Sequence, residues 1–382
     1  MKILMGLDYY RPNLSGLTLY AATLAESLAA RGHEVSVLTH RHRPELPRES
    51  VENGVRVVRA PVAARAGKAL ISPSILSRAL SEVPRSDVLH LHAPLVPAVP
   101  LSFVASTLRV PIVVTYHCDL KVPARAGPRL VETVARVAQD FALDRAERIV
   151  TNTEDYARHT PALADRIEKV EWILPPVVAP APASGDREAV RRRFGVAGSP
   201  IVFFLGRFAE EKGLLVLLDA FAEVRRRHPS AALVLAGATD LPGESVLDRL
   251  RPSLADPASG IAAPGEVDPA ALGDLFSIAD VFVLPSINST ESFGMAQVEA
   301  MLAGVPAVAS DLPGVREPVR MTGMGEIARA GDAVDLSRAI LRVLADPAAY
   351  RRPRAEIRER FSSETTVSRY EDLYRSVAGP HG

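Results

Sequence analysis

The 382-residue sequence predicts an α/β protein with two halves, each built on a parallel sheet that helices cover. Three observations support this fold class. Short β-branched or leucine-rich runs alternate with helical patterns, and the same alternation starts again after a proline-rich segment. The length suits two domains of ordinary size. Hydrophobic residues at 47% and charged residues at 24% are typical of a globular chain, which excludes wholesale disorder and a membrane-protein class.

The first half, residues 1–174, is predicted to be a Rossmann-like domain. A helix is expected from about Thr18 to Ala30, because apolar residues recur there with the helical period and Gly32 closes it. Strands are expected at Lys2–Leu7, Glu34–Leu38, Val55–Arg59, Val88–Leu91, Ile112–Thr115 and Arg148–Thr151.

The proline-rich segment 175–184 separates the halves. Its prolines favour a stiff, extended chain that continues neither a helix nor a central strand, so we place the domain boundary there. The second half, residues 185–360, repeats the Rossmann-like pattern, and residues 361–382 form a C-terminal helix. Expected strands are Ile201–Leu205, Ala232–Ala236, Val281–Leu284 and Ala307–Ser310, and expected helices are Gly213–Arg226, Gly294–Ala303 and a last stretch from Arg354 to Val377.

Charge and cysteine content exclude several functions. The 45 basic and 45 acidic residues balance, which removes the strongest sequence argument for a nucleic-acid partner. The single cysteine, Cys118, can form no intramolecular disulfide and no cysteine-based zinc site, as suits a reducing compartment. The N-terminal apolar run is too short for a signal peptide, and prolines break the apolar stretch 93–105. We expect a soluble, cytoplasmic protein, at most peripheral to the inner face of the membrane.

The first candidate site follows the strand Ile201–Leu205. Arg207 and Lys212 come directly after it, and a long helix follows, so both cations lie where a parallel sheet and a helix N-terminus bind anions. Lys212 is also one of only five lysines among the 45 basic residues. The alternative is that both are solvated charges that neutralise Glu210 and Glu211.

The second candidate site follows the strand Val281–Leu284. Glu291 lies in a loop that leads to a helix N-terminus, with Gly294 permitting close backbone approach, and Glu299 lies in the second turn of that helix. The alternative makes Glu291 a partner of the helix dipole and Glu299 a surface residue. The neighbours of Glu299 are apolar nearly all round the helix, and a carboxylate in such surroundings needs a partner.

Together these motifs resemble the retaining glycosyltransferases of family 4, which have the GT-B fold of two Rossmann-like domains. The match covers nearly the whole chain, in the right order and spacing. The matching features are Gly206-Arg207-x4-Lys212-Gly213, Glu291-x7-Glu299 with Phe293-Gly294 inside it, Gly304-x-Pro306 and Gly314-x-x-Glu317.

The resemblance implies a fold and an activity. The two domains would face each other across a cleft, with the C-terminal helix packing back on the N-terminal domain. The enzyme would move a sugar, expected to be a hexose, from a nucleotide-diphosphate sugar to an acceptor hydroxyl with retention at the anomeric carbon. It would need no metal and no other cofactor. The resemblance favours attack from the face that the phosphate leaves over a covalent enzyme intermediate. It also implies a role in bacterial-type glycan or glycolipid biosynthesis.

The resemblance also assigns roles in the second half. Arg207 and Lys212 would hold the donor diphosphate and stabilise the charge that grows on it. Glu291 would orient hydroxyls of the donor sugar, and Glu299 would bind the ribose. Further donor contacts are expected from Gly206, from Val267 in the loop that receives the base, and from the backbone amides of Phe293, Gly294 and Met295.

In the first half, the resemblance points to two strand ends. Gly16 lies in a glycine-containing turn before a helix and matches a loop near the diphosphate, although this sequence has Ser15-Gly16 where the family often has two glycines. His117 resembles the active-site histidine that contacts the donor sugar and acceptor region, with a structural histidine as the alternative. Asp119 is expected on the acceptor side, as a partner of the acceptor hydroxyl.

Other readings stay open or are rejected. The same fold also supports nucleotide-sugar epimerases, sugar phosphorylases and non-catalytic nucleotide-sugar binding modules. His90 and His92 share a strand face but make a poor metal site without a third ligand. The helical stretch Gly127–Arg148 is basic enough to suggest membrane docking, but its acidic residues favour an ordinary surface helix. The acceptor, the donor base and the donor sugar are not specified by the sequence.

Overall fold

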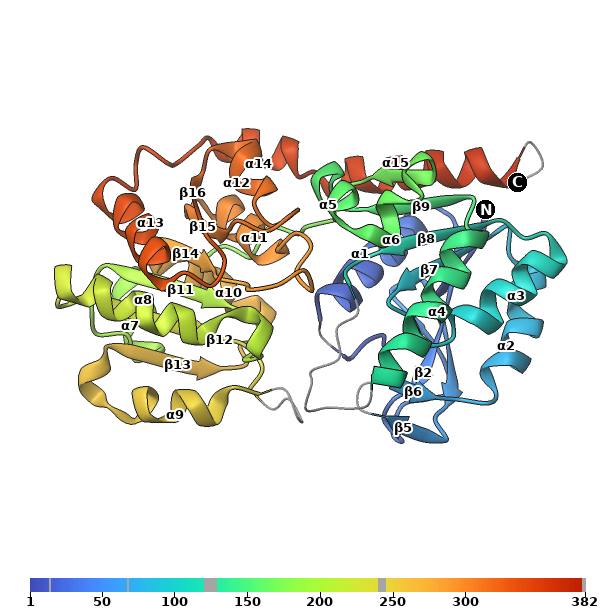
Figure 1. Ribbon diagram of the computed structural model, residues 1–382, viewed down its shortest axis with the longest axis horizontal. Coiled ribbons are helices and arrows are strands. Elements are labelled where there is room, and N and C mark those ends of the chain that lie inside the picture. The colour runs from blue at the N-terminus through green and yellow to red at the C-terminus, as the bar shows by residue number, and fades with distance from the viewer. Residues whose placement is uncertain (14, 67–68, 120–128, 240–244, 380–382) are drawn as a thin grey trace. The chain divides into compact units, whose positions relative to one another are not determined.

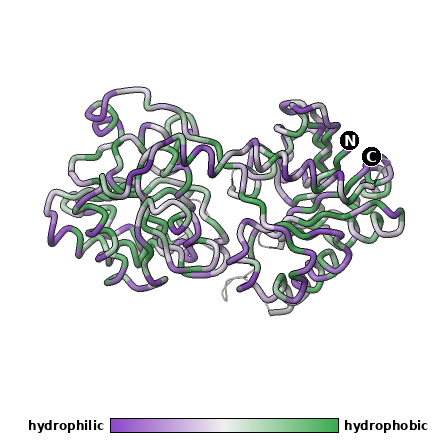
Figure 2. The backbone as a smooth tube through the Cα atoms, turned by 90° about the horizontal axis from the view of Figure 1, so that it is seen from above, coloured by the Kyte–Doolittle hydropathy of each residue, from purple (hydrophilic) through white to green (hydrophobic). Residues whose placement is uncertain are grey.

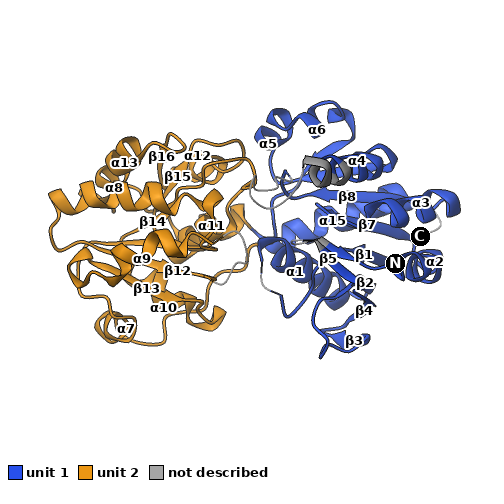
Figure 3. Ribbon diagram, turned by 60° about the horizontal axis from the view of Figure 1, so that its bottom comes forward, with its two compact units in different colours: residues 1–176, 362–382 blue, residues 177–361 orange. Residues whose placement is uncertain are grey.

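The computed structural model describes residues 1–382 except 14, 67–68, 120–128, 240–244 and 380–382 (Figure 1). The chain forms two compact units (Figure 3). Unit 1 comprises Met1–Pro176 and Ser362–Gly382, and unit 2 comprises Val177–Phe361. The chain therefore leaves unit 1 within the proline-rich segment and returns to it just after Phe361. Both units are α/β with parallel sheets, as the sequence predicted.

Unit 1 is built on an eight-stranded sheet in the order β10-β9-β8-β7-β1-β2-β4-β3. Every neighbouring pair is parallel except β3 and β4. The strands are β1 (Lys2–Gly6), β2 (Glu34–Arg41), β3 (Glu49–Glu52), β4 (Val55–Pro61), β7 (Val88–Ala93), β8 (Ile112–Tyr116), β9 (Arg148–Thr151) and β10 (Val170–Trp172). A separate antiparallel pair joins β5 (Ala64–Ala66) to β6 (Ala69–Ile71).

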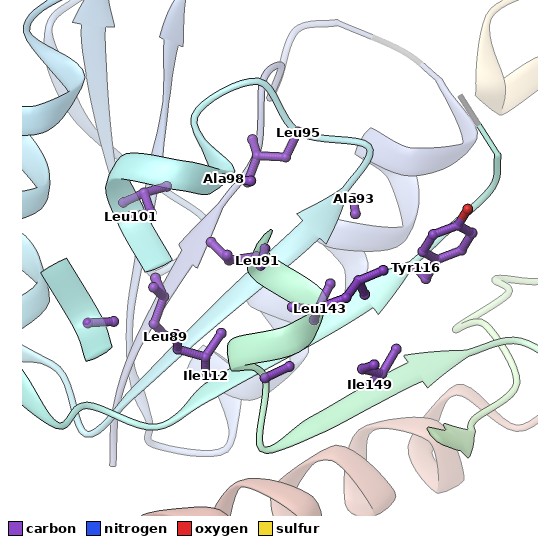
Figure 4. Packing of buried hydrophobic residues seen from close by; sticks show 14 of the residues in the cluster. Leu89, Leu91, Ala93, Leu95, Ala98, Leu101, Ile112, Tyr116, Leu143 and Ile149 are labelled. Carbon is purple, nitrogen blue, oxygen red and sulfur yellow. The ribbon is translucent and has the colours of Figure 1, made fainter. Parts of the chain in front are cut away.

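Helices cover both faces of this sheet. On one face α2, α3 and α4 pack on leucines and isoleucines of the central strands, among them Leu89, Leu91 and Ile112 (Figure 4). On the other face lie α1 and α15. The helices of unit 1 are α1 (Gly16–Ala30), α2 (Ile75–Glu82), α3 (Ala98–Leu108), α4 (Arg129–Arg145), α5 (Glu154–His159), α6 (Pro161–Ala164) and α15 (Ser363–Ala378).

The first helix begins earlier than its apolar pattern predicts. Ser15 caps it: the Ser15 hydroxyl accepts a hydrogen bond from the Thr18 N–H at 3.2 Å, and the Ser15 N–H donates to the Thr18 hydroxyl at 2.8 Å. This reciprocal capping box allows the helix to start at Gly16 instead of Thr18.

The C-terminal helix α15 packs on unit 1, as the sequence analysis expected. The Tyr370 hydroxyl forms buried hydrogen bonds with the hydroxyls of Tyr20 at 2.7 Å and Thr115 at 2.8 Å, and the Tyr374 hydroxyl bonds Nδ1 of His90 at 2.7 Å. The single helix predicted for 354–377 is wrong in one respect: it is divided. It ends as α14 at Arg360, and α15 starts anew with Ser362 as its N-cap.

Unit 2 is built on a six-stranded parallel sheet in the order β13-β12-β11-β14-β15-β16. The strand order reverses between β11 and β14, which pair directly. Such a reversal is the point of an open parallel sheet at which ligands bind. The strands are β11 (Ile201–Leu205), β12 (Ala232–Ala236), β13 (Ile261–Gly265), β14 (Val281–Leu284), β15 (Ala307–Ser310) and β16 (Gly325–Ala328).

The helices of unit 2 also cover both sheet faces, with α8 and α13 on one side and α10 and α11 on the other. Figure 2 shows hydrophobic residues gathered in the interior of each unit and hydrophilic ones along its outer helices and loops. The helices are α7 (Arg187–Arg193), α8 (Leu214–Arg227), α9 (Leu247–Ala255), α10 (Leu272–Ile278), α11 (Met295–Ala303), α12 (Glu317–Thr322), α13 (Ala333–Ala345) and α14 (Arg354–Arg360). Among the described residues, no helix has the length and apolar character to cross a bilayer.

Tyr370→Phe should destabilise unit 1. The change removes one buried hydroxyl that bonds two others, so we expect the free energy of unfolding to fall by about 1–3 kcal/mol in a denaturant titration. Arg375→Ala, on the exposed side of the same helix, serves as the control and should change it by less than about 0.5 kcal/mol. Equal, small effects of both substitutions would contradict the docking role of Tyr370.

Candidate functional site

The candidate residues of unit 2 lie at the carboxyl ends of β11 and β14. Gly206 and Arg207 follow β11, and Glu291 lies in the loop between β14 and α11. Because β11 and β14 pair in parallel, with Val202 opposite Val281, both loops leave the same edge of the sheet side by side. The Ile287 N–H donates to the carbonyl of Glu211 at 2.9 Å and joins the two loops directly.

Two glycines make close backbone contacts possible at this edge, one between these two loops and one between the loops after β11 and β12. Gly213 has φ +67, and a Cβ there would overlap the carbonyl oxygen of Pro285 in the neighbouring loop. A Cβ at Gly237, after β12, would overlap the carbonyl of Gly206. Both positions therefore require glycine for backbone packing as well as conformation.

The ion pairs at this edge match only in part the expectation that Arg207 and Lys212 neutralise Glu210 and Glu211. Arg207 Nη2 donates to Glu211 Oε1 at 2.6 Å, but Lys212 Nζ donates to Glu291 Oε2, 79 residues further along the chain. Glu210 instead lies 3.7 Å from Arg249 on the exposed surface. The alternative of local neutralisation thus describes Arg207 and not Lys212. The structure brings Lys212 and Glu291 together from the two loops.

The N-terminus of α11 completes this edge. Gly294, with φ +79, precedes the helix, and a Cβ there would overlap the side chain of Leu284. The N–H groups of Phe293, Gly294 and Met295 lie at the start of α11, where the helix itself offers them no acceptor. A helix start of this kind attracts an anion.

Gln297 was missed by the sequence analysis. Its buried side-chain Nε2 donates to the carbonyl of Phe293 at 2.6 Å and to that of Val315 at 2.8 Å, so it ties the loop before α11 to the loop after β15. The available signal was the one that singled out Glu299: a polar side chain on an otherwise apolar helix. Gln297 therefore fixes the backbone that leads into α11.

The Glu299 carboxylate has no hydrogen bond or ion pair with any residue that the structure describes. Burial raises the pKa of this carboxyl to about 7. The partner that the sequence analysis expected is thus not supplied by the described part of the chain. A carboxyl placed in this way can accept hydrogen bonds from hydroxyl groups of a ligand. Val267 lies two residues beyond β13, at the same edge of the sheet.

In unit 1, His117 follows β8 and lies against α1. Its Nε2 is 2.9 Å from Nδ1 of His92, and its ring meets the Tyr20 ring edge-on at 4.7 Å. Burial lowers the pKa of His117 to about 3, so the imidazole is neutral. Both ring nitrogens of the nearby His90 form hydrogen bonds, one with the Thr115 hydroxyl and one with the Tyr374 hydroxyl. Over the described residues, no group of three or more His, Cys, Asp or Glu side chains is placed to hold a metal.

Asp119 and Gly16 occupy the ends of two loops in unit 1. Oδ1 of Asp119 accepts from the Tyr116 hydroxyl at 2.8 Å, and the Asp119 N–H donates to the Tyr156 hydroxyl at 3.0 Å, so this segment is held firmly. Gly16 is the first residue of α1, while Leu14 in the same loop lies outside the described residues.

Asp8 is a second residue that sequence reasoning missed. It follows β1, which pairs with both β2 and β7, where the strand order of unit 1 reverses. Oδ2 of Asp8 accepts from the Val96 N–H at 3.1 Å, while Oδ1 is buried, 3.4 Å from Nδ1 of His40 and without a hydrogen bond among the residues described. Burial raises the pKa of the carboxyl to about 7. The signal was an acid at the end of an apolar strand.

Comparison with known proteins gives matches over both units. Residues 15–175 match the model of the glycosyl transferase 4-like domain, and residues 186–362 match that of the glycosyl transferases group 1. The phosphatidyl-myo-inositol mannosyltransferase of Mycobacterium tuberculosis is 30% identical over 404 residues, covering 99% of this chain and 98% of the relative.

Two further comparisons agree with these matches. The D-inositol 3-phosphate glycosyltransferase of Nocardia farcinica is 30% identical over 364 residues, covering 88% of this chain and 78% of the relative. The Anabaena protein HepE, in complex with UDP-glucose, has a TM-score of 0.78 at 20% identity, covering 98% of this chain and 100% of HepE. The chain therefore belongs to the group 1 glycosyltransferases, the family-4-type enzymes built on the GT-B fold of two Rossmann-like domains.

Proposed function

We propose that this glycosyltransferase moves a hexose from a nucleotide-diphosphate sugar to an acceptor hydroxyl, with retention at the anomeric carbon and without a metal or other cofactor. One observation carries the proposal. Lys212 and Glu291 come together from two neighbouring loops at the strand-order reversal of unit 2, beside the N-terminus of α11. A cation and a carboxylate placed there suit a ligand with both phosphate and hydroxyl groups.

The donor diphosphate would replace carboxylates as the partner of the two cations. In the free protein Arg207 pairs with Glu211 and Lys212 with Glu291. Phosphate oxygens of the bound donor would form ion pairs with Lys212 and Arg207. Glu291 would then be free to accept hydrogen bonds from the donor sugar. A guanidinium and an ammonium stabilise the leaving phosphate without a metal ion. The backbone amides of Phe293, Gly294 and Met295 would contact the same donor.

Glu299 would bind the ribose hydroxyls through its ionised carboxylate, with Val267 and Gly206 close to the nucleotide. The absence of a partner for Glu299 in the described chain, and its raised pKa, support this role. HepE, which shares the fold, is described with bound UDP-glucose, so uridine nucleotides are the first to test. Guanosine and adenosine nucleotides are tested beside them.

The transfer would proceed on one face of the sugar. The bond from the anomeric carbon to the phosphate oxygen breaks, the acceptor oxygen bonds the same carbon on the same side, and the acceptor proton passes to the departing phosphate. On this view catalysis consists of positioning and of electrostatic stabilisation of the leaving group. From unit 1, the acceptor-side domain, His117 would contact the donor sugar and the acceptor region, Gly16 would contact the donor diphosphate, and Asp119 would contact the acceptor hydroxyl.

The names of the two relatives guide the choice of acceptor. Both act on an inositol that carries a phosphate, as their names state, so inositol phosphates and phosphatidylinositol are the first acceptors to test. We place the reaction in the cytoplasm and do not favour membrane docking through α4, where Arg145 lies 3.5 Å over the Phe141 ring and Arg166 pairs with Asp144 at 2.6 Å.

A product assay tests the function directly. The purified protein is incubated with uridine, guanosine and adenosine diphosphate sugars, with and without acceptors, after a thermal-shift screen has identified the nucleotide that binds. Acceptor-dependent release of nucleoside diphosphate and an α-configured product from an α-configured donor are expected. Sugar conversion without any acceptor would indicate an epimerase, dependence on inorganic phosphate a phosphorylase, and binding without turnover a non-catalytic module.

Lys212→Ala should lower kcat by about 100-fold or more, because it removes a cation from the leaving phosphate. Thermal unfolding should change little, and Lys212→Arg should restore only part of the activity, because a planar fork replaces a compact ammonium. Arg249→Ala, which removes an exposed cation beside Glu210, is the control and should leave kcat unchanged. Near-normal turnover of Lys212→Ala would refute the assignment.

Nucleotide binding should depend on the ionisation of Glu299. Its carboxyl has a pKa of about 7 in the free protein, so the ionised fraction rises between pH 6 and pH 8. If only the ionised form binds ribose, the affinity for the nucleoside diphosphate should rise by about tenfold over this interval in calorimetric titrations. In Glu299→Gln all other groups of the protein and of the ligand still titrate. The affinity of this variant should therefore lack the part of the rise between pH 6 and pH 8 that comes from Glu299. Parallel pH profiles of the two proteins would contradict the role of Glu299.

A further inference from the structure

His92 and His117 are held together by the backbone of unit 1. They belong to the ends of the neighbouring parallel strands β7 and β8, whose register places Ala93 opposite Tyr116. The backbone N–H of His117 continues the hydrogen-bond ladder of the two strands by donating to the backbone carbonyl of Ala93 at 2.9 Å. Both imidazoles point to the sheet face that α1 and α15 cover, because residues alternate between faces along a strand.

The two rings meet edge to edge. Nδ1 of His92 and Nε2 of His117 are 2.9 Å apart, the ring planes differ by 16°, and the ring centres are 5.2 Å apart. Nearly coplanar rings with facing nitrogens place an N–H and a lone pair in line, which is the geometry of a hydrogen bond and not of face-to-face stacking. The Tyr20 ring, at 88° to His117, confines the second ring from the side of α1.

One proton lies between the facing nitrogens. Burial lowers the pKa of His117 to about 3 and that of His92 well below its ordinary value, so both rings are neutral. A neutral imidazole carries one N–H and one lone pair, so one of the two residues donates and the other accepts. Two arrangements are possible, and they differ in where the remaining proton of each ring lies.

The other nitrogen of His92 decides between them. Nε2 of His92 is buried and finds no hydrogen-bond partner in the described part of unit 1. If His117 donated, His92 would have to carry its own proton on Nε2, as an orphaned buried N–H. If His92 donates, Nε2 keeps only an unused lone pair, which is the less costly defect because buried N–H groups are almost always paired.

We propose that His92 is a positioning residue: its Nδ1–H donates to Nε2 of His117 and thereby keeps the proton of His117 on Nδ1. The described residues supply no partner for Nδ1 of His117, and this side chain is 7% exposed. His117 therefore presents one neutral N–H donor to a ligand, in a tautomer fixed by its neighbour. That this ligand is a sugar hydroxyl rests on the proposed function, whereas the hydrogen bond between the histidines does not.

Nitrogen NMR of the free protein tests the tautomer without any assay. In protein labelled with 15N-histidine, two-bond proton–nitrogen correlations separate a protonated ring nitrogen from an unprotonated one, and loss of one signal set in His117→Gln assigns His117. We expect Nδ1 protonated and Nε2 unprotonated. Because free neutral histidine prefers the opposite tautomer, the result is discriminating, and a His117 protonated on Nε2 would overturn the proposal.

Matched variants of His92 test whether its N–H donor holds the tautomer of His117 and supports turnover. His92→Asn keeps an N–H donor at the same distance from the backbone as Nδ1, so it should retain the tautomer and a kcat within about threefold. His92→Leu removes the donor; His117 should shift toward the Nε2–H form, and kcat should fall by about tenfold, the scale of one hydrogen bond. The affinity for nucleoside diphosphate, which lacks the sugar, should stay the same. His90→Leu, a buried histidine of the same strand, is the control and should leave the tautomer and kcat unchanged.

The outcomes separate this inference from the proposed function. A tautomer that does not change in His92→Leu would overturn the hydrogen bond, and a changed tautomer with unaltered kcat would overturn the positioning role. If no nucleotide sugar supports transfer by the unmodified protein, the sugar contact falls together with the proposed function, and the tautomer in the free protein still decides the hydrogen bond. If His92→Leu does not fold, the tautomer in the unmodified protein still decides the hydrogen bond, and a His92→Asn protein that keeps this tautomer but loses more than about threefold in kcat would overturn the positioning role.

Discussion

The direct parallel pairing of β11 with β14 is the constraint on which the candidate site of unit 2 depends. Because the chain reverses its strand order there, two loops far apart in sequence leave the same edge with no strand between them. Gly213 lets their backbones come into contact, and Gln297 fixes the segment that enters α11. The charged side chains are placed by this backbone, so the Lys212–Glu291 pair is a result of topology more than of local sequence.

The inner strands of the two sheets could be predicted from the sequence, but several strands at the sheet edges could not. Four strands of unit 2, β11, β12, β14 and β15, have the bounds that their apolar runs predict, because they are buried on both faces. The edge strands β13 and β16 of unit 2, and β3 and β10 of unit 1, were not predicted. They are partly exposed. Because β3, β10 and β16 contain glutamate and β13 contains Pro264, no continuous apolar run marks them.

The candidate site was predictable as a set of residues but not as a set of contacts. Strand ends followed by helices pointed to Arg207, Lys212 and Glu291, whereas the partner of Lys212 depends on which strands are neighbours. Polar residues inside the fold were harder. His92 looked like an incomplete metal ligand until the structure placed it at His117, because a hydrogen bond between adjacent strands depends on their register.

The return of the chain to unit 1 has a consequence for the order of folding. Unit 2 is one continuous segment, 177–361, and can complete its sheet as soon as that segment has been synthesised. Unit 1 begins first but lacks α15 until residues beyond Ser362 have been made. Until then Tyr20, Thr115 and His90 have no tyrosine hydroxyls from α15 to bond, so the unit that starts the chain is the last to be finished.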